Sequence, residues 1–102
     1  MTPEERAQEL TERVVASFDG SGSARYRQVM QALVRHLHAF AREVRLTDDE
    51  WRQGIEFLTR TGRATTETRQ EFVLLSDVLG LSMLAGSPVS VVSLMAPIRG
   101  GR

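Results

Sequence analysis

The chain has 102 residues, of which 41% are hydrophobic and 25% charged, and thirteen basic residues balance thirteen acidic ones to give a formal net charge of zero. This length fits one domain with a thin hydrophobic core, and zero net charge argues against a nucleic-acid-binding protein, which usually carries a basic excess. The absence of cysteine excludes disulfides, thiolate metal sites and cysteine nucleophiles.

The first predicted helix covers Thr2 to Phe18, with Thr2 as its N-cap and Pro3 at the first helical position. Its acidic, polar start does not have the form of a signal peptide, and no apolar run in the chain approaches the roughly 20 residues of a membrane span. We therefore expect a cytoplasmic protein without a membrane-spanning segment.

The second predicted helix covers Ala24 to Arg45 and carries apolar side chains in alternating steps of four and three residues. This spacing is typical of a heptad seam that packs against another helix. A helix of this length is about 33 Å long, which is longer than a small bundle needs. Part of it is therefore predicted to serve a partner. The seam consists of Tyr26, Met30, Leu33, Leu37, Phe40 and Val44.

The third predicted helix covers Leu46 to Gly62. Thr47 and Glu50 have the spacing of a capping box, in which the threonine oxygen accepts a hydrogen bond from the amide of the glutamate. Gly62 is predicted to end the helix in the left-handed conformation. One apolar face of this helix carries Trp51, Ile55 and Leu58.

The fourth predicted helix runs from about Thr65 to Ala85 and is apolar around most of its circumference, which indicates a central helix. Gly80 within it suggests close approach by another backbone, because glycine costs about 1 kcal/mol relative to alanine in a helix. The apolar stretch 89–95 is expected to lie on the bundle or on a neighbouring subunit. The predicted fold is all-α, a dimeric bundle of about four helices in residues 1–85 followed by an extended apolar tail, residues 86–102.

Two stretches, LVRHLHAFAREVRLTDDEWRQGIEFLTRTG and RQEFVLLSDVLGLSMLAG, resemble the N-terminal helical domain of the intradiol ring-cleaving dioxygenases, especially the hydroxyquinol 1,2-dioxygenase branch. The resemblance covers roughly residues 25–85. It implies a non-catalytic domain that joins two subunits into a dimer, with helices of both subunits enclosing an apolar channel that can hold a lipid. In that family the chemistry belongs to a following β-sandwich domain, where two tyrosines and two histidines bind ferric iron.

The iron ligands of that family have no counterpart in this chain. It contains one tyrosine, Tyr26, and two histidines, His36 and His38. Histidines two positions apart on a helix are separated by about 200° and cannot share one metal ion. Beyond about Gly86 the tail does not follow the family's route into the sandwich. We therefore expect no metal, no cofactor and no intradiol ring cleavage.

Four residues are candidates for acid–base chemistry without a metal: Asp77, His36, His38 and Tyr26. A carboxylate in an apolar helix is costly to bury unless it is paired, so Asp77 is either half of an interhelical ion pair or a general acid or base in an apolar cavity. The histidines are either scaffold residues or, singly, proton-transfer groups lining a pocket. The structural interpretation is favoured for the aspartate and for the histidines.

Three functions are compatible with these residues. The first is a homodimerisation module that binds an apolar or aromatic small molecule. The second is a cofactor-independent enzyme for condensation, cyclisation or isomerisation of an aromatic substrate in a bacterial biosynthetic pathway. The third is an accessory subunit of a separate catalytic chain. The candidate ligand-binding residues are Trp51, Phe40, Leu37, Phe72 and Arg69.

Overall fold

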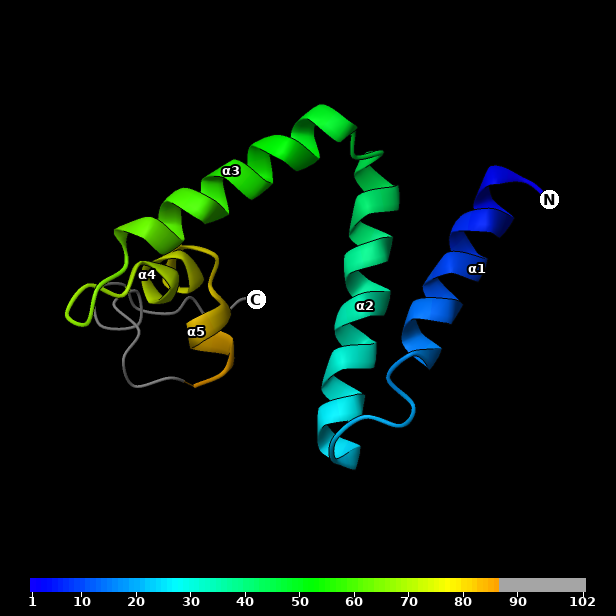
Figure 1. Cartoon of the computed structure of the whole chain (residues 1–102), viewed down its shortest axis with the longest axis horizontal. Helices are drawn as coiled ribbons and strands as arrows, with labels where there is room; N and C mark the ends of the chain where they lie inside the picture. The colour runs from blue at the N-terminus through cyan, green and yellow to red at the C-terminus, as the bar shows by residue number, and fades with distance from the viewer. Residues whose placement is uncertain (87–102) are drawn as a thin grey trace, which may run out of the picture. The chain divides into compact units, whose positions relative to one another are not determined.

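The computed structural model describes residues 1–86 and shows five helices in them (Figure 1). No strand occurs in these residues, which confirms the predicted all-α class. Backbone contacts divide the chain into two compact units, Met1–Asp48 and a second unit that begins at Asp49. Apart from Gly86, the predicted tail lies outside the described residues. Within residues 1–86, none of the helices combines the length and the apolar character that crossing a membrane requires.

Helix α1 covers Pro3–Ala16 and begins with the predicted cap. The Thr2 hydroxyl accepts a hydrogen bond from the backbone N–H of Glu5 at 3.0 Å, and the Glu5 carboxylate accepts one from the backbone N–H of Thr2 at 2.7 Å. This reciprocal pair satisfies two backbone donors that a helix start otherwise leaves unbonded. The helix ends two residues before the predicted limit at Phe18, with Ser17 as its C-cap.

Helix α2 covers Ala24–Val44 and matches the prediction to within one residue. It begins at Ser23, whose hydroxyl accepts a hydrogen bond from the backbone N–H of Tyr26 at 3.0 Å. It ends at Arg45, which adopts the left-handed conformation with φ 53°. Helices α1 and α2 lie side by side in the first unit (Figure 1).

The face that α2 turns toward α1 is not the apolar seam. The hydrogen bonds to α1 come from Gln31, His38 and Arg42, and the first two of these follow seam residues Met30 and Leu37 by one position. One position corresponds to about 100° of rotation around an α-helix. Helix α1 therefore packs on a neighbouring, more polar face of α2, and the apolar seam remains available to another surface.

Helix α3 covers Asp48–Ala64 and begins directly after Thr47, where the sequence predicts the cap. The predicted end at Gly62 is wrong, because the helix continues for two residues and Gly62 does not have a positive φ. The backbone N–H of Thr65 instead donates to the carbonyl of Gly62 at 3.2 Å, so the last turn tightens and no left-handed residue is needed.

The predicted fourth helix is two helices, α4 at Glu71–Val78 and α5 at Leu81–Leu84. It begins later than predicted because a hydrogen-bonded turn precedes it, in which Thr66 and Arg69 exchange two bonds of 2.8 and 3.0 Å. Gly80 separates α4 from α5 with φ 80°. The expected close approach of another backbone is not made by residues 1–86, none of which lies within 4 Å of a Cβ placed there. Glycine is needed at this position for its backbone conformation.

We predict that Gly80→Ala lowers the free energy of unfolding by about 1–2 kcal/mol, because an L-residue is strained in the left-handed region. Gly62→Ala is the matched control. It lies inside α3, and its added methyl would meet the Phe72 ring at an ordinary 3.6 Å. This control should raise stability by up to about 1 kcal/mol. Urea denaturation followed by circular dichroism measures both, and a Gly80→Ala variant as stable as the parent would contradict the left-handed turn.

Candidate functional site

The most extensive exposed apolar surface of the first unit is the α2 seam, which consists of the six residues named for it above. Leu33, Leu37 and Phe40 are 51%, 55% and 52% exposed, and Tyr26 and Val44 are exposed to a similar extent. No hydrophobic side chain among residues 1–86 is fully buried. A row of half-exposed large apolar side chains on one helix face marks a surface that binds a partner or a ligand. Two predicted ligand-binding residues, Leu37 and Phe40, belong to this row.

A second apolar surface lies on α3. Trp51, Ile55 and Leu58 share one helix face, as the sequence predicts, and each is about half exposed. The guanidinium carbon of Arg52 lies 6.0 Å from the centre of the Trp51 ring, at the outer limit of a cation–π contact. This arrangement leaves the flat face of the predicted ligand-binding tryptophan partly covered by its neighbour.

The two histidines have different surroundings. Nδ1 of His38 lies 2.7 Å from the Thr11 hydroxyl oxygen, and that hydroxyl donates its own proton to the carbonyl of Ala7 at 3.0 Å. Which of the two atoms donates in the bond between this hydroxyl and Nδ1 depends on the tautomer of His38. Thr11 is buried and His36 is exposed on the surface of α2. His38 thus joins α2 to α1, while a catalytic role for either histidine stays a prediction.

Tyr26 stands at the start of the α2 seam. Its ring meets Phe18 edge to face, with centroids 6.4 Å apart and ring planes inclined by 60°. Gly22 has a φ of 53°, and a Cβ at this glycine would lie 2.8 Å from the tyrosine ring. The turn before α2 therefore requires glycine so that Tyr26 can pack there. A catalytic role for Tyr26 also stays a prediction.

Asp77 is the most buried residue of the part of the chain that the structure describes, at 1% exposure. It lies on α4, close to the turn into α5, where the hydroxyls of Ser76 and Ser82 lie 2.7 Å apart and join the two helices. Arg69, one predicted partner of this aspartate, instead bonds to Glu71 with 2.8 Å between Nε and Oε2. Of the four predicted catalytic residues, three lie on α2 in the first unit and Asp77 lies on α4 in the second unit. A catalytic role for Asp77 stays a prediction.

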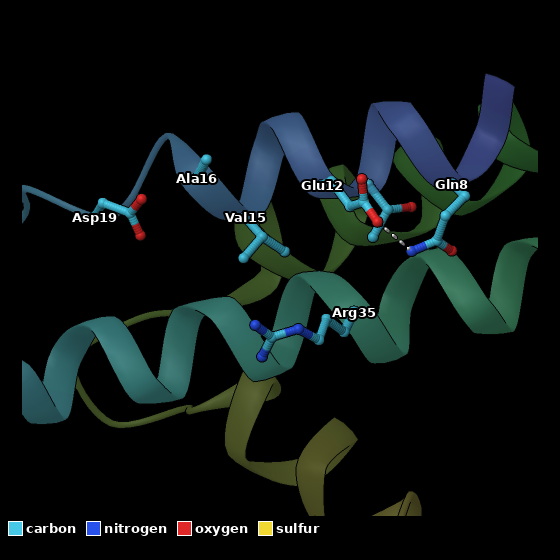
Figure 2. Close-up of a pocket in the computed structure, with 7 residues that line it drawn as sticks. Gln8, Glu12, Val15, Ala16, Asp19 and Arg35 are labelled. Atoms are coloured by element: carbon cyan, nitrogen blue, oxygen red, sulfur yellow. Dashed lines mark hydrogen bonds between the residues drawn. The ribbon is translucent and has the colours of Figure 1, made fainter. Parts of the chain in front are cut away.

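A polar cleft lies between α1 and α2, with a volume of about 350 Å³. Figure 2 shows Glu12 and Asp19 on the α1 side and Arg35 on the α2 side. The Gln8 side chain donates to Glu12 at 3.2 Å, and Gln31 donates to Asp19 at 2.9 Å. No sequence pattern predicts this cleft, because its charged residues come from different helices. Its lining consists of Gln8, Thr11, Glu12, Val15, Ala16, Asp19 and Arg35.

An apolar groove of about 280 Å³ lies between α3 and α4. Glu71 forms part of the wall of this groove and makes an ion pair with Arg69. Arg69, a predicted ligand-binding residue, therefore lies beside the groove. Phe72, also predicted, does not line it, and its ring lies beside Gly62. The groove could hold one small apolar ring with a single polar substituent near the glutamate. Its lining consists of Phe57, Thr61, Glu71, Leu74, Leu75 and Val78.

The described residues do not fit the ferric iron site that the resemblance implies. Residues 1–86 contain no group of three or more histidine, cysteine, aspartate or glutamate side chains that could hold a metal ion. Tyr26 packs on Phe18, and the Nδ1 atom of His38 is directed at Thr11.

Comparison with known proteins supports the resemblance noted from the sequence. Residues 23–87 match the family described as the catechol dioxygenase N terminus. The hydroxyquinol 1,2-dioxygenase of Nocardioides simplex is 65% identical over 78 residues, which are 76% of this chain and 27% of that protein. The 6-chlorohydroxyquinol 1,2-dioxygenase of Cupriavidus pinatubonensis is 61% identical over 75 residues, with 74% and 27% coverage.

A solved structure gives the same result for the fold. The hydroxyquinol 1,2-dioxygenase from Pseudomonas putida DLL-E4 matches with a TM-score of 0.78 and 42% identity, over 94% of this chain and 32% of that one. The chain therefore spans about a quarter to a third of the length of the proteins that it matches. These matches confirm the predicted resemblance to the helical N-terminal region of intradiol dioxygenases.

We predict that the bond between Thr11 and His38 contributes about 1 kcal/mol to the stability of the α1–α2 pair. A double-mutant cycle of Thr11→Val and His38→Leu, followed by urea denaturation, measures this coupling. His36→Leu serves as the control, because this exposed histidine should change stability by less than about 0.5 kcal/mol. A coupling near zero would show that the contact does not hold the two helices together.

Proposed function

The chain belongs to the catechol dioxygenase N-terminal domain family, and from this premise we propose that it is a homodimerisation module that also binds a small apolar or aromatic molecule in the cytoplasm. The exposed α2 seam is the observation that carries this proposal. Under this proposal, the 102-residue chain contributes an interface and a binding surface rather than ring-cleaving chemistry of its own.

The size of the seam supports a stable pair. Five of its six side chains are about half exposed and offer on the order of 500 Å² of mostly apolar surface per copy. Flanking side chains bring this toward the roughly 800 Å² per partner of a standard specific interface. Burying such a surface against a second copy supplies the apolar contact that the first unit does not make internally.

The order of residues along the seam suits an antiparallel pair. A twofold axis midway between Leu33 and Leu37 places each of these leucines opposite the other in the second copy. The same axis sets Tyr26 opposite Val44 and Met30 opposite Phe40. Each layer then combines a larger and a smaller side chain or two of equal size, which fills space evenly. Such an interface uses the same patch on both copies, as a twofold dimer requires.

The groove between α3 and α4 supports the ligand part of the proposal. Its wall is mostly apolar, from Phe57, Leu74 and Val78, and its volume suits one aromatic ring better than a whole lipid. The relatives are named for hydroxyquinol, a small aromatic compound. We therefore propose a single-ring aromatic as the class of ligand, with its polar substituent near Glu71.

We predict that Leu33→Glu and Leu37→Arg each abolish the homodimer, because each pair would bury two unpaired charges. The dissociation constant should rise by roughly 100-fold or more, as measured by analytical ultracentrifugation. An equimolar mixture of the two variants should form a mixed pair, since in the antiparallel arrangement the glutamate meets the arginine. Ala39→Glu adds a charge at an exposed position of α2 off the seam and is the control that should remain dimeric.

Two results would contradict this arrangement. If Leu33→Glu dimerises as well as the parent chain, the seam is not the interface. If both variants are monomeric but their mixture gives no pair, the seam is the interface but the antiparallel order is wrong.

We predict that phenol shifts the methyl signals of Leu75 and Val78 in heteronuclear NMR spectra. Leu74→Asp should weaken this binding about tenfold or more, because it places a charge in the apolar wall. Leu79→Ala removes an exposed leucine outside the groove and should bind phenol as the parent does. Equal responses in the parent and Leu74→Asp would exclude the groove as the binding site.

A further inference from the structure

We propose that the polar cleft between α1 and α2 is a binding site for a free basic amino acid, such as arginine or lysine. The cleft lies within the first unit and has a volume of about 350 Å³, which suits a single amino acid better than a peptide. The inference uses neither the α2 seam nor the groove beside α4, so its test is independent of the proposed function.

The cleft carries more negative than positive charge. Two carboxylates, Glu12 and Asp19, lie on its α1 side, and one guanidinium, Arg35, lies on its α2 side (Figure 2). These three groups sum to one net negative charge, so a complementary ligand has two cationic groups and one anionic group. A basic amino acid has this combination, with an α-ammonium, a side-chain cation and an α-carboxylate.

Both carboxylates are oriented by neutral donors, which leave their charge uncompensated. The Gln8 side chain donates to Oε2 of Glu12 at 3.2 Å, and Nε2 of Gln31 donates to Oδ1 of Asp19 at 2.9 Å. In the part of the chain that the structure describes, neither carboxylate forms an ion pair, and Arg35 has no hydrogen-bond or ion-pair partner. All three charged groups are therefore available to a ligand.

The spacing of the two carboxylates is too wide for one metal ion and fits a ligand with two separated cations. Glu12 and Asp19 are about two helical turns apart, which is about 10 Å along the axis. The helical path continues past Ala16, because the backbone N–H groups of Phe18 and Asp19 donate to carbonyls three residues earlier. The two cations of a basic amino acid are roughly 7 Å apart, and hydrogen bonds of about 2.8 Å at each end let it reach both carboxylates.

Arg35 distinguishes an amino acid from a simple diamine. Figure 2 shows its side chain on α2 at a level between Glu12 and Asp19. A guanidinium binds a carboxylate through two parallel hydrogen bonds, so the α-carboxylate of the ligand has a matching partner there. A diamine has no group for Arg35 and is repelled by it, whereas an anion such as phosphate is repelled by both carboxylates.

The test is titration of the 102-residue chain with L-arginine and, separately, with agmatine, which is arginine without its carboxylate. Heteronuclear NMR spectra should show shifts of the backbone amide signals of Thr11 and Ala16. The dissociation constant of arginine should be about tenfold lower than that of agmatine. Non-specific attraction to a negatively charged cleft predicts the opposite order, because agmatine carries more positive charge.

Two variants test the assigned contacts. Arg35→Gln should remove the preference for arginine over agmatine, because the neutral side chain no longer pairs with the carboxylate. Asp19→Asn should weaken arginine binding by about tenfold. The matched control is Arg25→Gln, which removes the same charge from an exposed position of α2 outside the cleft and should bind arginine as the parent chain does.

Three results would overturn the inference. The first is an absence of shifts at Thr11 and Ala16 when arginine is added. The second is agmatine binding as tightly as arginine to the parent chain, a comparison that requires no variant to fold. The third is an unchanged preference for arginine in Arg35→Gln. A preference for arginine that disappears only in Arg35→Gln, and not in Arg25→Gln, would support it.

Discussion

The constraint on which the other features depend is the separation of two faces on α2. One face carries Gln31 and His38 and is occupied by α1 through hydrogen bonds. Another face carries the apolar seam and stays largely exposed. A helix hairpin joined by polar contacts gains little from hydrophobic burial, so its apolar face is available for assembly. The proposed pairing, in a chain that belongs to the dioxygenase N-terminal family, uses the exposed apolar face of α2 and leaves the polar face in contact with α1.

Much of the fold could be predicted from local sequence. The Thr2 cap, the limits of α2 and the start of α3 follow from side-chain chemistry that acts within a few residues. Two of the wrong predictions concern glycines, because Gly62 and Gly80 have the same conformational freedom and only the surrounding turns decide which of them adopts a positive φ. Gly62 stays helical, while Gly80 ends α4 in the left-handed conformation.

The candidate sites were less predictable than the helices. The heptad spacing identified the seam, but it did not show that α1 would pack on a different face, because Gln31 and His38 are polar and add nothing to an apolar periodicity. The cleft near Arg35 and the groove beside Leu74 each combine side chains from two helices. Such sites depend on how helices pack, and a single sequence does not encode this in a pattern that can be read directly.

The most direct measurement of the central claim is the mass of the unmodified chain in solution, by sedimentation equilibrium over a range of micromolar concentrations. A chain that pairs through the seam forms a particle of twice the 11.4 kDa chain mass, which dissociates only on dilution. A particle of 11.4 kDa at every concentration, with the seam leucines still accessible to solvent, would contradict it.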